Sequence, residues 1–166
     1  MPRQGASSAG AILLTLGRVK SWQPQTIDGV PDGVILIDGV CVLCSRGALF
    51  VIARDPAAIF RFVTVQEPYG RRLAERLGID AEQPETNAVI LGGRAYFKSD
   101  AAIEALALLP SWSWVRVMRL VPRALRHAAY DLVARNRYRW FGRADHCLLP
   151  TADLARHFLA GDATLR

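Results

Sequence analysis

The feature that most constrains the fold of this sequence is an alternation of short apolar runs with longer amphipathic runs across residues 34–109. Four of the short runs predict strands, at residues 34–38, 60–66, 88–91 and 94–98. The second run, FRFVTVQ, alternates and is rich in aromatic and β-branched residues, which favour a pleated surface. Gly92-Gly93 predicts a tight turn that joins the last two strands in a hairpin.

Three amphipathic runs predict helices, at residues 43–54, 68–77 and 100–109. Pro68 stands at the start of the second helix and Gly78 just past its end, where these residue types are favoured. Ser99 or Asp100 is the expected cap of the third helix, because short polar side chains accept hydrogen bonds from the first turn. The elements therefore follow in the order β-α-β-α-β-β-α.

This order predicts the α/β class and the core of the thioredoxin fold, with an appended C-terminal helical segment. The two helical crossovers imply parallel strands, and the hairpin adds an antiparallel strand. Residues 1–32 are rich in Gly, Pro, Ser and Gln and are expected to form an N-terminal extension, poorly ordered or laid over the domain. We expect residues 33–150 to form one domain and residues 151–166 to form a C-terminal helix and tail. The domain includes a basic helical segment, residues 111–150, with helices near 112–121 and 123–136.

The positive charge of the chain is concentrated in the second half. The net charge is +6, and residues 111–143 hold eight arginines but one acid, Asp131. Arginine suits contacts with anions and paired positions, so this segment could face an anionic partner. No run is apolar enough to predict a transmembrane span. Three cysteines are too few for a disulfide scaffold and leave one unpaired, which favours a reducing compartment, and we expect the cytoplasm.

The Cys-x-x-Cys of Cys41 and Cys44 stands where the first strand gives way to the first helix. Unpaired N–H groups and the helix dipole stabilise an anion at a helix N-terminus, so a thiolate is favoured at Cys41. One helical turn brings Cys44 close enough for a disulfide. We expect Cys41 to attack a substrate disulfide and Cys44, the more buried thiol, to resolve the mixed disulfide.

Other interpretations of these cysteines stay open. They could be two small core residues in a non-catalytic module that docks partners through its basic segment. They could also bind zinc together with His146 and Cys147, although the second half lacks the usual ligand spacing. Under the redox interpretation no bound cofactor is needed. The partners would be a disulfide-containing protein or a small thiol substrate and a cellular thiol reductant.

Two neighbouring features have a structural and a functional interpretation. Asp38 ends the first strand and could tune the thiols or accept the proton of Cys44, or it could form an Asx turn that shapes the loop. Residues 135–141 interleave arginines with aromatic residues, a pattern that can bind nucleic acid. We favour a helix that packs these aromatic residues inward while the arginines pair with acids.

The sequence resembles the DCC family of thiol-disulfide oxidoreductases over about residues 33–150. Two motifs carry the resemblance: DGVCVLC, with Asp38, Cys41 and Cys44, and YDLVARNRYRWFGRADHCLLP, Tyr130 to Pro150. The resemblance implies a thioredoxin-like fold and dithiol chemistry at the two cysteines. The sequence departs from the wider thioredoxin pattern, because no proline directly precedes the third strand. We therefore expect substrate docking to differ from that of thioredoxin.

Overall fold

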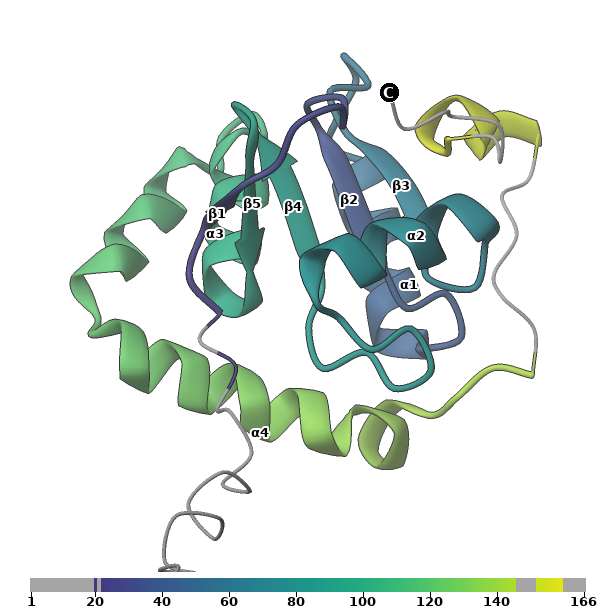
Figure 1. The fold of residues 1–166 in the computed structure, drawn as a ribbon. Helices are drawn as coiled ribbons and strands as arrows, with labels where there is room; N and C mark the ends of the chain where they lie inside the picture. Colours follow the sequence, from purple (N-terminus) through teal and green to yellow (C-terminus); the bar gives the residue numbers. More distant parts are fainter. Residues whose placement is uncertain (1–19, 21, 146–151, 160–166) are drawn as a thin grey trace, which may run out of the picture.

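A computed structural model describes residues 20, 22–145 and 152–159 as a mixed α/β protein (Figure 1). Its five-stranded sheet has the order β1-β5-β4-β2-β3. The strands are β1 (Gln25–Thr26), β2 (Val34–Ile37), β3 (Arg61–Thr64), β4 (Ala88–Leu91) and β5 (Arg94–Phe97). β2 pairs with β3 in parallel, as the first helical crossover predicts, whereas β4 pairs antiparallel with both β2 and β5, so the parallel strand predicted for the second crossover is wrong. The predicted hairpin is confirmed, with positive φ at Gly92 and Gly93.

The helices are α1 (Val42–Ile52), α2 (Pro68–Leu77), α3 (Lys98–Ala107) and α4 (Arg123–Phe141), with 3₁₀ helices η3 (Ser113–Leu120) and η4 (Ala152–His157). The side chains of the sheet alternate between two apolar clusters, as the strand period requires. Leu36 packs in the cluster that includes Leu73 of α2, and Ile35 packs in the cluster with Ala48 of α1 and Ala105 of α3. The sheet therefore lies between two helical layers, with α2 in front of it and α1 behind it in Figure 1.

The elements from Val34 to Ala107 follow in the predicted order of strands and helices, and the α/β class is confirmed. The arrangement is consistent with a thioredoxin-like fold. The predicted cap of the third helix is wrong, because α3 begins at Lys98 with Phe97 at the cap position. The Lys98 N–H donates to Oγ1 of Thr86 at 2.8 Å instead. Asp100 is engaged elsewhere, in an ion pair with Arg126 at 2.7 Å.

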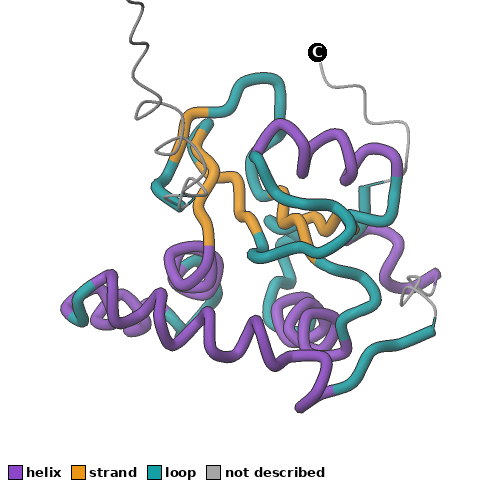
Figure 2. Tube along the Cα trace, turned by 60° about the horizontal axis from the view of Figure 1, so that its bottom comes forward, coloured by secondary structure: helices purple, strands orange, loops and turns teal. Residues whose placement is uncertain are grey.

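The basic segment forms η3 and then one long helix, α4, of 19 residues. α4 contacts both α1 and α3, and Figure 2 shows it crossing that side of the molecule. The expectation that residues 135–141 pack their aromatic residues inward is wrong for Trp140 and Phe141, which are exposed. The residue of this stretch that is buried is Arg137.

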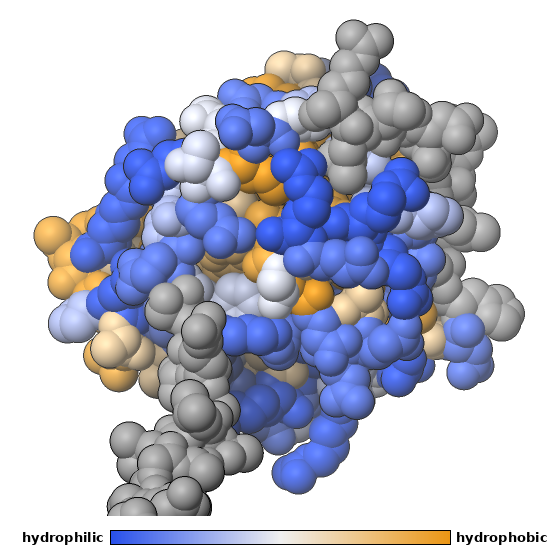
Figure 3. Space-filling view, viewed as in Figure 1, coloured by the Kyte–Doolittle hydropathy of each residue, from blue (hydrophilic) through white to orange (hydrophobic). Residues whose placement is uncertain are grey.

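Several arginines of the basic segment do pair with acids, as predicted. Arg126 and Arg123 both bind Asp100 of α3 at 2.7 Å, and Arg119 pairs with Glu104. Apolar residues near the end of η3, among them Leu120, are exposed, and an apolar patch is visible at the left edge of Figure 3. The segment is therefore held to α3 by charge while part of its outer surface is apolar.

Both flanking segments contribute to the sheet. Within the predicted N-terminal extension, β1 pairs with β5 and Ile27 is buried in the core, so these residues lie over the domain. At the other end, Phe158 forms a parallel bridge with Phe62 of β3, and the Leu159 N–H donates to the Phe62 carbonyl at 3.1 Å. The main sheet edges thus receive short additions from outside the predicted core.

Candidate active site

Cys41 lies at the junction between β2 and α1, where the sequence predicted it. It is the N-cap residue of α1, and its Sγ accepts a hydrogen bond from the Cys44 N–H at 3.3 Å. A thiol at this position replaces the usual hydroxyl or carboxylate that binds the first-turn N–H groups. The bond favours the charged form of sulfur, because a thiolate is a better acceptor than a thiol.

The two thiols differ in acidity. The pKa of Cys41 is lowered to about 7, first by a hydrogen bond from the Cys44 thiol and further by the Cys44 N–H and the positive charge of Arg137, while burial opposes the shift. The pKa of Cys44 is raised, because its thiol donates that bond, is removed from water and lies beside the charge on Cys41. Cys41 is therefore the thiolate of the pair near neutral pH.

The prediction that Cys44 is the more buried thiol is wrong. Cys41 is 0% exposed, whereas Cys44 is partly exposed. The cover comes from a segment directly after α4, residues 142–145, which we call the strap. Arg143 forms an antiparallel bridge with Cys41, and the Ala144 N–H donates to the Val40 carbonyl at 2.9 Å. The sequence did not reveal this cover, because it comes from about a hundred residues away.

The carboxylate of Asp38 is 1% exposed and accepts several hydrogen bonds. Its donors are the Val40 N–H at 3.3 Å, Gln66 Nε2 at 2.9 Å, Arg137 Nη2 at 3.1 Å and the Tyr138 hydroxyl. The bond to Val40 is the Asx turn that the sequence allowed. The ion pair with Arg137 joins the cysteine loop to α4. Asp38 raises the pKa of both thiols by its charge, and Arg137 lowers it, so the pair partly cancels.

A second group of polar residues lies on the Cys44 side of the motif. The Cys44 thiol points toward Asn87 Oδ1 at 4.0 Å, a weak contact. The Asn87 N–H donates to the Tyr130 hydroxyl at 3.1 Å. Asn87 directly precedes β4, the place where the thioredoxin pattern has a proline. A side chain of α4 therefore occupies the backbone N–H at this position.

An apolar groove of about 350 Å³ opens beside Cys44 between α1, α3 and the sheet. Ile35, Ile37 and Val89 of the sheet line it. Cys44, Asn87 and Tyr130 stand together at one end. Phe50 and Trp112 also line it and meet edge to face, with ring centroids 5.1 Å apart. We call this the apolar groove.

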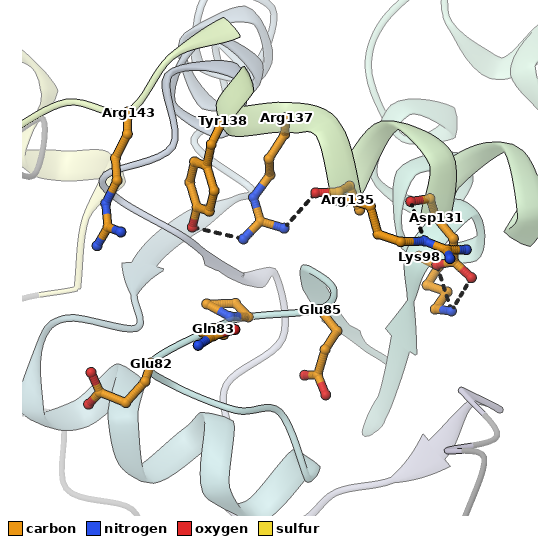
Figure 4. A pocket seen from close by; sticks show the side chains of 11 residues that line it. Glu82, Gln83, Glu85, Lys98, Asp131, Arg135, Arg137, Tyr138 and Arg143 are labelled. Carbon is orange, nitrogen blue, oxygen red and sulfur yellow. Dashed lines mark hydrogen bonds and ion pairs between the residues drawn. The ribbon is translucent and has the colours of Figure 1, made fainter. Parts of the chain in front are cut away.

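A larger polar groove, of about 890 Å³, lies between the loop Glu82–Glu85 and α4 (Figure 4). Arg137 and Tyr138 reach toward it from α4, and Glu82 and Glu85 line it from the loop, with their carboxylates turned away from α4. It shares Arg137 with the surroundings of the cysteine loop, but neither cysteine lines it. The two grooves thus present opposite chemistry, and Lys98 lines both of them.

No three His, Cys, Asp or Glu side chains within the described residues lie close enough together to hold a metal ion. His146 and Cys147 lie outside the described residues, so the zinc site with Cys41 and Cys44 stays a prediction. In the same part of the chain, no helix combines the length and apolar character needed to cross a bilayer.

The site contains residues that the sequence pattern did not single out: Gln66, Asn87, Tyr130, Arg137 and Tyr138. The last three lie in the second motif of the family resemblance, which marked the stretch but not the individual side chains. An arginine amid seven others on one segment gives no sequence signal of burial. Gln66 ends the predicted strand FRFVTVQ, two positions beyond Thr64, the parallel partner of Ile37, and this register could have indicated that it lies near Asp38.

Comparison with known proteins gives a consistent result. The model of the family described as "DCC1-like thiol-disulfide oxidoreductase" matches residues 35–143. "Uncharacterized protein YuxK" of Bacillus subtilis is 34% identical over 136 residues, which are 81% of this chain and 99% of that protein. "DCC family protein At1g52590, chloroplastic" of Arabidopsis thaliana is 33% identical over 118 residues, 70% of this chain and 69% of that protein. No solved structure matches the chain.

Proposed function

This chain belongs to the DCC1-like thiol-disulfide oxidoreductase family, and we propose that it is a thioredoxin-like enzyme that exchanges disulfides through Cys41 and Cys44. The observation that carries the proposal is the asymmetry of the two thiols. Cys41 caps α1 and its pKa is lowered to about 7, while Cys44 donates to it. Two structural cysteines in a core have no need of this arrangement.

The reaction proceeds in two exchanges. The Cys41 thiolate attacks one sulfur of a substrate disulfide, a bond forms between Cys41 and that sulfur, and the other substrate sulfur leaves as a thiolate. Cys44 then loses its proton and attacks Sγ of Cys41, which forms the Cys41–Cys44 disulfide and releases the second substrate thiolate. The substrate gains two electrons and the protein loses two. A thiol reductant recharges the pair, and no bound cofactor takes part.

Asp38 acts mainly as a positioning residue. Its carboxylate holds Arg137 at 3.1 Å, and the positive charge of Arg137 lowers the pKa of both thiols. The four donors around Asp38 also fix the loop that places Cys41 at the start of α1. The helix N-terminus and this ion pair together tune the dithiol.

Attack by Cys41 requires the strap to open, because the residue is 0% exposed. The strap is held at this point by one backbone bond of 2.9 Å, from Ala144 to Val40, and by the bridge to Cys41. Opening such a short segment costs little free energy compared with unfolding of the domain. The strap thus protects the thiolate between reactions. A reducing compartment such as the cytoplasm would supply the thiols that recharge the pair.

The rate of iodoacetamide alkylation, measured against pH and assigned to each cysteine by mass spectrometry, tests the proposal. We expect Cys41 to react with an apparent pKa of about 7, and Cys44 to stay unmodified to higher pH. The control is Cys41→Ser, in which no titration near neutral pH should remain. If both cysteines of the wild type follow the ordinary value of about 8.5, Cys41 is not an activated nucleophile and the proposal fails.

A further inference from the structure

The apolar groove has features that the exchange at Cys41 does not use. Its volume of about 350 Å³ is in the range of small-molecule sites. Among the residues that the structure describes, Lys98 is the one charged residue that lines it, and its Nζ is paired with Asp131 at 2.7 Å. The groove therefore offers a redox thiol, Cys44, at one end of an otherwise apolar surface.

Gly47 provides a separate observation. It lies inside α1 and lines the groove, and a Cβ added there would meet no other atom within 4 Å. Glycine inside a helix costs about 1 kcal/mol relative to alanine, so helix stability favours a larger residue and the open space around Gly47 would accommodate one. Its absence of a side chain keeps the groove wide about one turn after Cys44.

Access also separates the two sulfurs. Cys41 is 0% exposed under the strap, whereas Cys44 is partly exposed and lines the groove. In a Cys41–Cys44 disulfide, a molecule in the groove reaches Cys44 first. Exchange at Cys44 expels Cys41, whose sulfur caps α1 and accepts the Cys44 N–H, and a leaving thiolate that is stabilised in this way leaves faster.

We propose that the apolar groove binds a low-molecular-weight thiol with an apolar body, which reduces the oxidised pair by attacking Sγ of Cys44. The inference rests on the proposed function, because it needs the Cys41–Cys44 disulfide as its starting state. It adds the class of reductant and its place of entry. Substrate disulfides meet Cys41 when the strap opens, and the reducing thiol enters on the other side.

The recharging reaction uses two thiols. The first, as a thiolate, forms a sulfur–sulfur bond with Cys44 and breaks the bond to Cys41, which leaves as a thiolate. A second thiol then attacks the sulfur of the first and releases Cys44, which takes up a proton. The pair gains two electrons, and the two small thiols are oxidised to one symmetrical disulfide.

The test measures how fast the oxidised full-length protein is reduced by ethanethiol, butanethiol and hexanethiol, with 2-mercaptoethanol as a polar reference. Quenching in acid and mass analysis report the free cysteines. Burial of each added methylene should raise the second-order rate constant about fourfold. With Cys41 alkylated as it is released, the trapped small thiol should be found on Cys44.

Two variants fill the groove from opposite walls. Gly47→Leu and Ala102→Leu should abolish the dependence on chain length, so that hexanethiol and butanethiol reduce the protein no faster than ethanethiol. Ala102 is exposed at the groove, and the matched control Ala128→Leu makes the same change at an exposed position of α4 outside it. The control should keep the wild-type dependence. Circular dichroism establishes that each variant is folded.

The outcomes separate this inference from the proposed function. If no Cys41–Cys44 disulfide forms, or no thiol reduces it, the proposed function fails together with the inference. If the disulfide forms and all four thiols reduce it with no effect of chain length, the inference alone is overturned. It is overturned equally if the small thiol is trapped on Cys41, or if the groove-filling variants behave like Ala128→Leu.

Discussion

Cys41 and Cys44 are one helical turn apart, yet the two sides of this turn have different physical chemistry. On the side of Cys41, which we call the polar side, Asp38, Gln66, Arg137 and the strap surround a sulfur with no exposed surface. On the side of Cys44, the apolar side, the residue is partly exposed and lines a groove of apolar side chains. One side stabilises charge on sulfur and the other provides access for apolar groups.

This difference teaches how a dithiol can separate two tasks. Hydrogen bonds and an ion pair can stabilise a thiolate only if they are held in place, which calls for buried and well-connected polar groups. Binding of apolar groups requires an open surface free of unpaired charge. The start of a helix allows both, because Cys41 at the cap position meets the preceding loop and the strap, whereas Cys44 in the first turn lines the groove.

The largest effect should come from exchanging the two sulfurs for oxygen in turn. Cys41→Ser should lower disulfide reduction by about 10³-fold or more, because a hydroxyl is not an effective nucleophile toward disulfides at neutral pH. The variant Cys44→Ser keeps a hydrogen-bond donor near Cys41. Its Cys41 should still attack the substrate, but a mixed disulfide on Cys41 should accumulate because no second thiol resolves it. Activity assays and intact mass would show this. Equal activity of the two variants would remove the distinction between the sides.

Removal of the buried charge on the polar side should have the next largest effect. Arg137→Met leaves the Asp38 carboxylate buried without its ion pair, and such a change costs about 3–5 kcal/mol of folding free energy. The matched control Arg139→Met changes an exposed arginine of the same helix and should alter stability by less than about 0.5 kcal/mol. Urea unfolding measures both. A small effect of Arg137→Met would mean that the ion pair does not organise the polar side.

The ionisation of Cys41 should make the reduced protein more stable between pH 7 and about pH 8.5, above which the raised pKa of Cys44 acts in the opposite direction. The pKa of Cys41 is about 7 in the folded state and about 8.5 in an unfolded chain, so folding favours the deprotonated form. This stability is present above pH 8.5 and is lost as pH falls through 7. Between pH 7 and pH 8.5 the free energy of unfolding should rise by about 1 kcal/mol. Denaturant titrations of wild type and Cys41→Ser, which should lack the rise, would sharpen the comparison.

The strap should give a change of similar or smaller size. Ala144→Pro removes the N–H that donates to the Val40 carbonyl, and loss of about 1 kcal/mol corresponds to roughly fivefold more open strap. Alkylation of Cys41 should accelerate by that factor, with the rate at Cys44 unchanged. Ala144→Ser keeps the N–H and serves as the control. Faster reaction of both cysteines would indicate general loosening in place of a local cover.

The polar and apolar sides differ in how far the sequence predicts them. Cys41, its place at the end of a strand and the start of a helix, and the Asx turn at Asp38 follow from local pattern, because these features depend on neighbouring residues. The element order from residue 34 to 107 is predictable for the same reason. The start of α3 could not be predicted in this way, because the Lys98 N–H binds Oγ1 of Thr86, just before the neighbouring strand β4, and not a cap formed by Ser99 or Asp100.

The relative exposure of the two cysteines could not be predicted, because it depends on tertiary packing of distant segments. The strap, which follows the C-terminus of α4, contacts Cys41, and the side chain of Arg137 in the same helix binds Asp38. Nothing local distinguishes Arg137 from the exposed Arg135 and Arg139. The apolar groove likewise exists only where α1, α3 and the sheet meet, so its shape has no linear signature.

The ion pair between Asp38 and Arg137 spans 99 positions of the chain, which has a consequence for biosynthesis. A ribosome releases the cysteine motif long before α4, so an emerging chain carries both thiols without the counter-charge and without the strap. The Arg137 charge that lowers the pKa of Cys41 and the strap that buries this residue are then added together, when α4 docks. A truncated or stalled chain would therefore carry the motif without the surroundings that set its chemistry. The ordinary reactivity of its thiols would show that α4 and the strap had not yet docked.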